Sequence, residues 1–260
     1  MAAEPGSVQF SIGRVIGDSF GVLARNIVSF GILSLLIGLI GLVFGLVFAD
    51  TSQLEAAQND PAQFEAAMQQ FNWWGFALTI LVIIVVYFLT QAAIIYGTFQ
   101  DLRGQKAGVG DCIARGLSSV VPVAVGSILL SLGIMIGSIF LIVPGIILAL
   151  MWWVYVPAIV VEGKGIIEAF GRSRELTRGR RWHILGLVVI LIILMFVVGF
   201  IAQMVVMIIA SQGGLAGSII EYLFNALVTA YTAVLAAVAY YYLRAEKEGV
   251  DVNEIARVFD

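Results

Sequence analysis

Six long apolar segments dominate the pattern of hydrophobic and polar positions along the chain. Each has about the 20 apolar residues that a helix needs to cross the hydrocarbon core of a bilayer. The segments are 27–49, 74–99, 120–140, 142–161, 184–210 and 218–243. This pattern predicts an all-α integral membrane protein whose six transmembrane helices are paired along the chain as three hairpins.

Basic residues are confined to one side of this predicted topology. All fourteen Lys and Arg residues lie in the two termini and in the connections 101–119 and 162–183. The connections on the other side hold none. Because positively charged loops remain on the cytoplasmic side of a membrane, we expect a multi-pass protein of the cell (cytoplasmic) membrane with both termini in the cytoplasm.

The composition agrees with a membrane protein. A mean hydropathy of +1.03, with 61% hydrophobic and 12% charged residues, excludes an ordinary soluble domain. The longest polar connection is too short to bury a core of its own. We therefore expect a single membrane domain over 1–260, without a soluble catalytic module.

Three similar tetrads precede the first, third and fifth spans. They are Asp18-Ser19-Phe20-Gly21, Asp111-Cys112-Ile113-Ala114 and Glu168-Ala169-Phe170-Gly171. Each lies in a stretch with apolar residues on one helical face, and such helices beside a membrane tend to lie in its interface. We predict a cytoplasmic-side amphipathic interfacial helix before each hairpin.

These similarities also suggest an internal repeat. Units of approximately 9–100, 107–161 and 165–243, followed by a tail at 244–260, would be parallel repeats about an axis along the membrane normal. Convergence among helices that lie beside a membrane would produce the same similarity. Both interpretations are open at this point.

The fourth span has features of an irregular helix. It begins at Val143-Pro144-Gly145, and Pro157 lies near its inner end. Trp152 and Trp153 lie deeper than the aromatic belts that flank a bilayer. The sequence therefore predicts a short, tilted or irregular fourth span.

Small residues recur at helical spacing on two spans. Gly38, Gly41 and Gly45 lie on the first span, and Gly133 and Gly137 lie on the third. Such residues let helix backbones approach closely inside a membrane. We predict that they serve helix packing, either within the chain or in a homo-oligomer; the alternative is that they line a pathway.

Polar residues share one face of the sixth span. Glu221, Asn225, Thr229 and Thr232 are spaced for this face, and Gln203 on the fifth span could join them. An unpaired charge in lipid costs about 3 kcal/mol or more, so Glu221 is a candidate functional group. Alternatively, Glu221 reaches the outer headgroups or stabilises the helix N-terminus.

Five arginines lie within ten residues before the fifth span. They are Arg172, Arg174, Arg178, Arg180 and Arg181. Near the inner leaflet, each cation attracts anionic lipid by about 1 kcal/mol. We predict that they contact anionic headgroups of the cytoplasmic leaflet, although topology alone would also explain these charges. No aromatic stacking platform accompanies them, so we expect no nucleic-acid partner.

Catalytic motifs are not found in the sequence. The single histidine, His183, follows Trp182 at a membrane boundary, and Cys112 is the single cysteine. There is no metal-ligand spacing, nucleophile elbow or phosphate-binding glycine loop. We expect a protein that is not an enzyme and holds no metal or cofactor.

The stretch 143–186 resembles a known group of proteins. The resemblance is carried by Val143-Pro144-Gly145, Pro157, Glu162-Gly163, Glu168-Ala169-Phe170, Leu176-Thr177-Arg178-Gly179 and Trp182. It is similar to a prokaryotic membrane family that contains the YciC-like proteins and the membrane domain accompanying some glycerophosphodiester phosphodiesterases. The resemblance implies a multi-pass protein of uncharacterised function. The soluble phosphodiesterase domain is missing here, so that activity is not implied.

Two functions remain under consideration. The first is a non-catalytic, lipid-contacting membrane scaffold or organiser. The second is a transporter or channel for a small solute or ion that uses the polar face of the sixth span. A continuous cavity containing Glu221 and Gln203 would favour the transporter.

Overall fold

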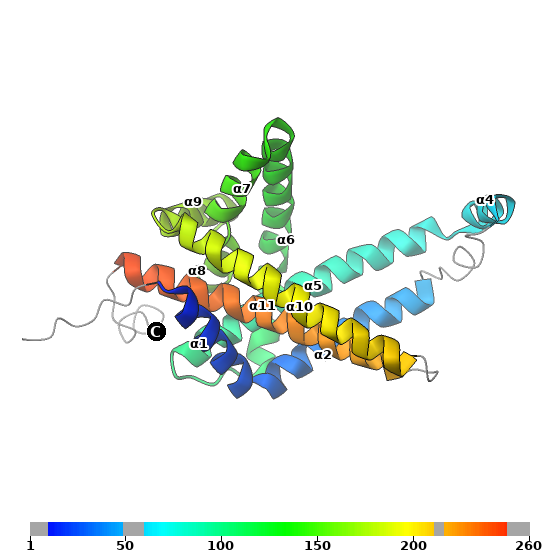
Figure 1. The fold of residues 1–260 in the computed structure, drawn as a ribbon, viewed down its shortest axis with the longest axis horizontal. Helices are drawn as coiled ribbons and strands as arrows, with labels where there is room; N and C mark the ends of the chain where they lie inside the picture. The colour runs from blue at the N-terminus through cyan, green and yellow to red at the C-terminus, as the bar shows by residue number, and fades with distance from the viewer. Residues whose placement is uncertain (1–9, 49–59, 211–215, 249–260) are drawn as a thin grey trace, which may run out of the picture.

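A computed structural model describes residues 10–48, 60–210 and 216–248, and within these ranges the secondary structure is helical (Figure 1). The helices, labelled as in Figure 1, are α1 (Ile12–Arg25), α2 (Ile27–Phe48), α4 (Pro61–Gln70), α5 (Trp73–Leu102), α6 (Val109–Phe140), α7 (Ile142–Met151), α8 (Tyr155–Glu162), α9 (Ile166–Thr177), α10 (Arg181–Ala210) and α11 (Ala216–Glu248).

The predicted fold class is confirmed at the level of an all-helical protein with several membrane-spanning helices. Within the described ranges, α5, α6, α7 together with α8, α10, and α11 provide five segments long and apolar enough to cross a membrane. A sixth is reached if α1 and the start of α2, which meet at 79°, form one bent span. The membrane type and the orientation of the termini stay predictions.

The helix before the third span differs from the prediction. The stretch expected to form a separate interfacial helix is the N-terminal part of α6, a single helix of 32 residues. Pro122, near the start of the predicted third span, lies inside α6 without ending it. By contrast, α1 and α9 are separate helices, so the three units are not built alike.

The predicted irregularity of the fourth span is confirmed. The span is interrupted between α7 and α8 by a turn at residues 152–154. Pro157 lies in the first turn of α8, where a helix does not use the N–H group that proline lacks. The break therefore precedes the proline instead of coinciding with it.

Helix α9 satisfies the backbone groups that this break leaves open. The buried hydroxyls of Ser173 and Thr177 donate hydrogen bonds to the carbonyl oxygen of Met151, at 3.0 and 3.1 Å. The Ser173 oxygen also accepts a hydrogen bond from the backbone N–H of Val154 at 3.3 Å. Since lipid supplies no such partners, α9 stabilises the broken span.

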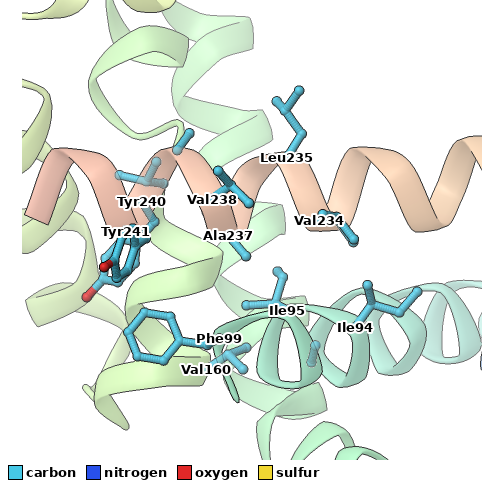
Figure 2. Packing of buried hydrophobic residues seen from close by; sticks show 14 of the residues in the cluster. Ile94, Ile95, Phe99, Val160, Val234, Leu235, Ala237, Val238, Tyr240 and Tyr241 are labelled. Carbon is cyan, nitrogen blue, oxygen red and sulfur yellow. The ribbon is translucent and has the colours of Figure 1, made fainter. Parts of the chain in front are cut away.

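Helix α11 lies at the centre of the fold and packs against α1, α2, α5 and α10. The pair formed by α6 and α7 points away from α2, α5, α10 and α11 (Figure 1). The buried core lies where the helices converge, between the C-terminal halves of α5 and α11 (Figure 2). Ile94 and Ile95 of α5 face Val234, Val238 and Tyr240 of α11 there, and these side chains are fully or almost fully buried.

The three similar tetrads have one environmental feature in common. Their second residues, Ser19, Cys112 and Ala169, are all buried, each from a different helix. Close helix packing alone would select a small residue at such positions. The threefold repeat and the boundaries of its units therefore stay predictions.

Candidate functional site

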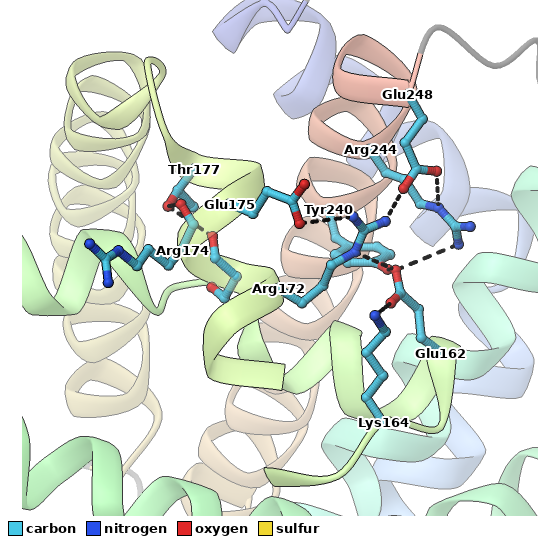
Figure 3. A network of polar contacts seen from close by, with 10 residues as sticks. Glu162, Lys164, Arg172, Arg174, Glu175, Thr177, Tyr240, Arg244 and Glu248 are labelled. Carbon is cyan, nitrogen blue, oxygen red and sulfur yellow. Dashed lines mark hydrogen bonds and ion pairs between the residues drawn. The ribbon is translucent and has the colours of Figure 1, made fainter. Parts of the chain in front are cut away.

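A buried carboxylate at the end of the fourth span organises a network of polar contacts (Figure 3). The Glu162 side chain is 7% exposed. It accepts a hydrogen bond from the Arg172 Nε at 3.0 Å and from the Tyr240 hydroxyl. Lys164 Nζ lies 3.2 Å away and Arg244 Nη1 lies 3.8 Å away. One carboxylate thus joins α8, α9 and α11.

Arg172 extends this network from α9. Its guanidinium donates to Glu175 at 3.4 Å and to Glu248 near the end of α11, in addition to Glu162. Burial opposes the Arg172 charge, but the hydrogen bonds to Glu248 and Glu162 outweigh this effect and raise its pKa above the ordinary value. Arg172 therefore stays charged and serves contacts inside the protein.

A second internal pair uses Arg180, in the turn between α9 and α10. Its Nε donates a hydrogen bond of 2.7 Å to Glu246 on α11. The other oxygen of Glu246 accepts from the backbone N–H of Phe10 at 3.0 Å. On the neighbouring face of α11, the Tyr242 hydroxyl contacts Asp18 of α1. The end of α11 thus holds α1, the N-terminal segment and the α9–α10 turn together.

The three other arginines of the predicted cluster line a surface hollow. This arginine hollow, of about 490 Å³, is lined by Arg174, Arg178, Gly179, Arg181 and Trp182. Arg174 and Arg178 are exposed. Figure 3 shows Arg174 extending away from the network that Arg172 joins. For all five arginines, contact with anionic lipid stays a prediction. The structure divides them into two groups: Arg172 and Arg180 bind carboxylates of the protein, and the other three line the arginine hollow.

The turn between α9 and α10 builds the arginine hollow. Gly179 has a φ of +86°, a left-handed conformation that glycine adopts without the steric cost of a side chain. The turn brings the end of α9, with Arg174 and Arg178, beside Arg181 at the start of α10. Three formal positive charges therefore lie at the N-terminus of a helix, where the helix dipole also favours anions.

The described members of the predicted polar site, which are Gln203, Asn225, Thr229 and Thr232, do not line the arginine hollow. Gln203, Asn225 and Thr232 are exposed, and Thr229 is half-buried. The Thr232 hydroxyl donates to the backbone carbonyl of Thr229 at 3.0 Å. Glu221 belongs to α11, but its side chain lies outside the described part of the structure.

The glycines of the third span lie against the fourth. A methyl group added to Gly133 would come within 3.0 Å of the Trp152 ring, and one added to Gly137 within 3.0 Å of Leu148. The backbone nitrogen of Gly145 is also 3.3 Å from that second position. The absence of side chains thus permits the close approach of α6 and α7. For the other predicted packing residues, Gly38, Gly41 and Gly45 of α2, the contacts lie outside what the structure describes.

An apolar groove of about 380 Å³ is lined by residues of α1, α2 and α11. Leu23 and Ile27 line one wall, and Leu223, Phe224 and Leu227 line the other. A groove of this composition on a span is compatible with a lipid chain. Among its described lining residues, none is one of the polar residues that the sequence singled out.

Sequence reasoning did not identify Glu162, Tyr240 or the acids of the α11 end as parts of one network. A usable signal was present, because Glu246 and Glu248 follow the last span on the side where the basic residues gather. Acids at this place are natural partners for arginines. Which arginine each one would bind was not readable from the sequence.

A family model described as "Domain of unknown function (DUF7847)" matches residues 102–243, which is more than half of the chain. This region contains the Glu162 network up to Tyr240 and the whole arginine hollow. Neither a curated protein nor a solved structure matches the chain. The match names neither the YciC-like group nor the phosphodiesterase-associated domain, so that finer resemblance stays a prediction.

Proposed function

Because the chain belongs to the DUF7847 family, whose function is unknown, we propose a function from its own geometry: a non-catalytic membrane scaffold that contacts anionic lipid. The proposal includes a cell-membrane location with both termini on the cytoplasmic side. The finer kinship with YciC-like prokaryotic membrane proteins is part of the same proposal.

The observation that carries the proposal is the arrangement around the start of α10. Three arginines and Trp182, which is 83% exposed, surround the end of a long apolar helix. Tryptophan is enriched at the level of lipid headgroups, and arginines at this depth attract anionic lipids. The surface has the composition of a protein region that lies in the headgroup layer of the cytoplasmic leaflet.

The internal network supports the scaffold interpretation in a different way. Arg172, Arg180 and their carboxylate partners hold α8, α9 and α11 in a fixed arrangement. A rigid base keeps the neighbouring hollow in a constant shape. Within the network, each arginine is paired with a carboxylate of the protein. The arginines outside the network are therefore the ones that we assign to lipid contact.

The transporter alternative has less support from the described residues. Three of the polar residues on which it depends, Gln203, Asn225 and Thr232, are exposed at the surface of the chain. A permeation path would require them to face a shared interior. We therefore base the proposed function on the cytoplasmic face and not on the sixth span.

The test compares lipid enrichment around two variants with the same net charge. Replacing Arg174, Arg178 and Arg181 with Gln should reduce the enrichment of phosphatidylglycerol over phosphatidylcholine around the extracted protein, and added salt should mimic the loss. The control replaces three exposed cations elsewhere, Arg14, Lys106 and Lys247. Equal enrichment for the hollow variant and the unmodified protein, after correct insertion is verified, would contradict the proposal.

A further inference from the structure

The arginine hollow is positively charged, and it also has the size and chemistry of a binding site for a single small ligand. Its volume of about 490 Å³ falls within the range of about 300–1,000 Å³ that is typical of small-molecule sites. Among the described residues that line it, three are arginines and none is acidic. The hollow is thus a concave cationic site and differs from a flat basic surface.

The cations of the hollow repel one another unless an anion joins them. Arg174 lies in the last turn of α9, Arg178 follows the end of that helix, and both line the hollow together with Arg181, so three like charges share one site. The protein compensates Arg172 and Arg180 with Glu162, Glu248 and Glu246. The described part of the hollow's lining offers no corresponding carboxylate, so an external anion would supply the negative charge.

Phosphate has the geometry that these groups recognise. A guanidinium presents a planar fork of N–H donors that matches two phosphate oxygens. The first-turn N–H groups of α10 add donors without acceptors inside the helix, because an α-helix leaves these groups open. A helix N-terminus with this arrangement favours phosphate binding.

From this arrangement we propose that the arginine hollow is a binding site for a phosphomonoester group. A phosphomonoester carries up to two negative charges, whereas a phosphodiester carries one, so three arginines and a helix N-terminus compensate the former more completely. The inference rests on the proposed function, since it assigns a ligand class to the same surface.

Two kinds of molecule, a membrane lipid and a soluble metabolite, carry a phosphomonoester group. Trp182 is exposed at the start of the α10 span, which places the hollow within reach of a lipid headgroup such as that of phosphatidic acid. A soluble phosphomonoester such as glycerol 3-phosphate presents the same group from the aqueous side. The binding site is the same in both cases, and the experiment separates the sources.

The experiment uses the full-length chain in phosphatidylcholine nanodiscs. One arm adds phosphatidic acid, a second adds phosphatidylglycerol at matched surface charge, and a third adds glycerol 3-phosphate without anionic lipid. Retained lipid is counted by native mass spectrometry, and the soluble ligand is followed by titration calorimetry. We expect preferential retention of phosphatidic acid over phosphatidylglycerol by at least about tenfold, equivalent to about 1.4 kcal/mol.

Two triple variants test the role of the arginines. With Gln at positions 174, 178 and 181, affinity for the phosphomonoester should fall at least about tenfold, equivalent to about 1.4 kcal/mol. With Lys at these positions, the charges that direct insertion are retained, but the forked donors are lost and the preference for phosphatidic acid should shrink. The Arg14, Lys106 and Lys247 control should keep the preference. The Lys variant keeps the test informative if the Gln variant does not fold.

The outcomes separate this inference from the proposed function. In one outcome, the unmodified protein retains both anionic lipids equally and the Gln variant loses both. That result overturns the phosphomonoester site and leaves the proposal of a lipid-contacting scaffold intact. No effect of the Gln variant on either lipid overturns both. Binding of glycerol 3-phosphate at an affinity equal to that of phosphatidic acid supports the site with a soluble source, and retention of phosphatidic acid alone supports it with a lipid source.

Discussion

The Tyr240 hydroxyl donates a hydrogen bond to the Glu162 carboxylate, across the contact between α11 and the end of α8. Both groups are buried, and the same carboxylate binds Arg172. This relationship joins two spans that are 78 residues apart in the chain. It places a negative charge at the centre of the converging helices, where the surrounding cations stabilise it.

Replacing Tyr240 with Phe should lower stability without disrupting the fold. The substitution removes one hydrogen bond to a charged group, which contributes about 1.5–3 kcal/mol, while Arg172 still binds Glu162. Thermal unfolding in detergent measures the effect. Tyr87→Phe is the control, because the Tyr87 side chain is exposed and its hydroxyl accepts only a long hydrogen bond of 3.3 Å from the uncharged Gln91 side chain, so its loss should change little. Equal unfolding temperatures for the two variants would show that the Tyr240 hydrogen bond adds nothing.

Glu162 and Arg172 should be energetically coupled. Glu162→Gln leaves Arg172 without one of its partners, and Arg172→Gln leaves the buried Glu162 short of a cation. The double variant removes the opposing charges together, so its loss of stability should be smaller than the sum by about 0.5–3 kcal/mol. A double-mutant cycle on unfolding free energies measures this coupling. Additive losses would mean that the contact is geometrically present but energetically neutral.

The break in the fourth span should depend on the two hydroxyls of α9. Combining Ser173→Ala with Thr177→Val removes both side-chain donors to the Met151 carbonyl. An unsatisfied buried acceptor costs about 1–3 kcal/mol, so the double variant should unfold at lower temperature. Each single variant keeps one donor and should lose less. Ser118→Ala, at an exposed hydroxyl on α6, is the control. A double variant as stable as this control would show that the carbonyl finds another donor.

Close packing between α5 and α6 should make Gly116 sensitive to substitution. A methyl group there would lie 2.9 Å from the Leu89 side chain and 3.0 Å from its backbone oxygen. Overpacking of this kind costs about 1–3 kcal/mol. Gly110 on the same helix has open space around it, so Gly110→Ala should be neutral or slightly stabilising. The pair is compared by thermal unfolding, and equal stability of the two variants would disprove the close contact.

The predicted topology is tested by labelling single cysteines in a Cys112→Ser background. A cysteine in place of Gln63, on the exposed surface of α4, should react with an impermeant thiol reagent added to intact cells. One in place of Gln105, in the connection between α5 and α6, should react only after the cells are opened. Labelling of the Gln105 variant from outside would reverse the orientation derived from the basic residues.

Some features of this protein follow from the sequence by itself. The membrane-spanning segments and their approximate ends are predictable because the length of an apolar helix must match the hydrocarbon thickness. The irregular fourth span was also predicted from Pro157 and the deep tryptophans, although the break lies at residues 152–154 and Pro157 fits the first turn of α8. Before the third span the same local reasoning predicted a separate interfacial helix, whereas the structure has one continuous helix, α6, from Val109 to Phe140.

The tertiary structure alone decided the use of each arginine. Arg172 and Arg178 lie on or beside one short helix and are chemically identical, yet Arg172 binds Glu162 and Glu248 while Arg178 lines the hollow. The difference arises because α9 turns one face toward the end of α11, whose acids are distant in the chain. Electrostatic pairing depends on distance in space, and a local sequence pattern does not encode the distance between Arg172 and a residue 76 positions away.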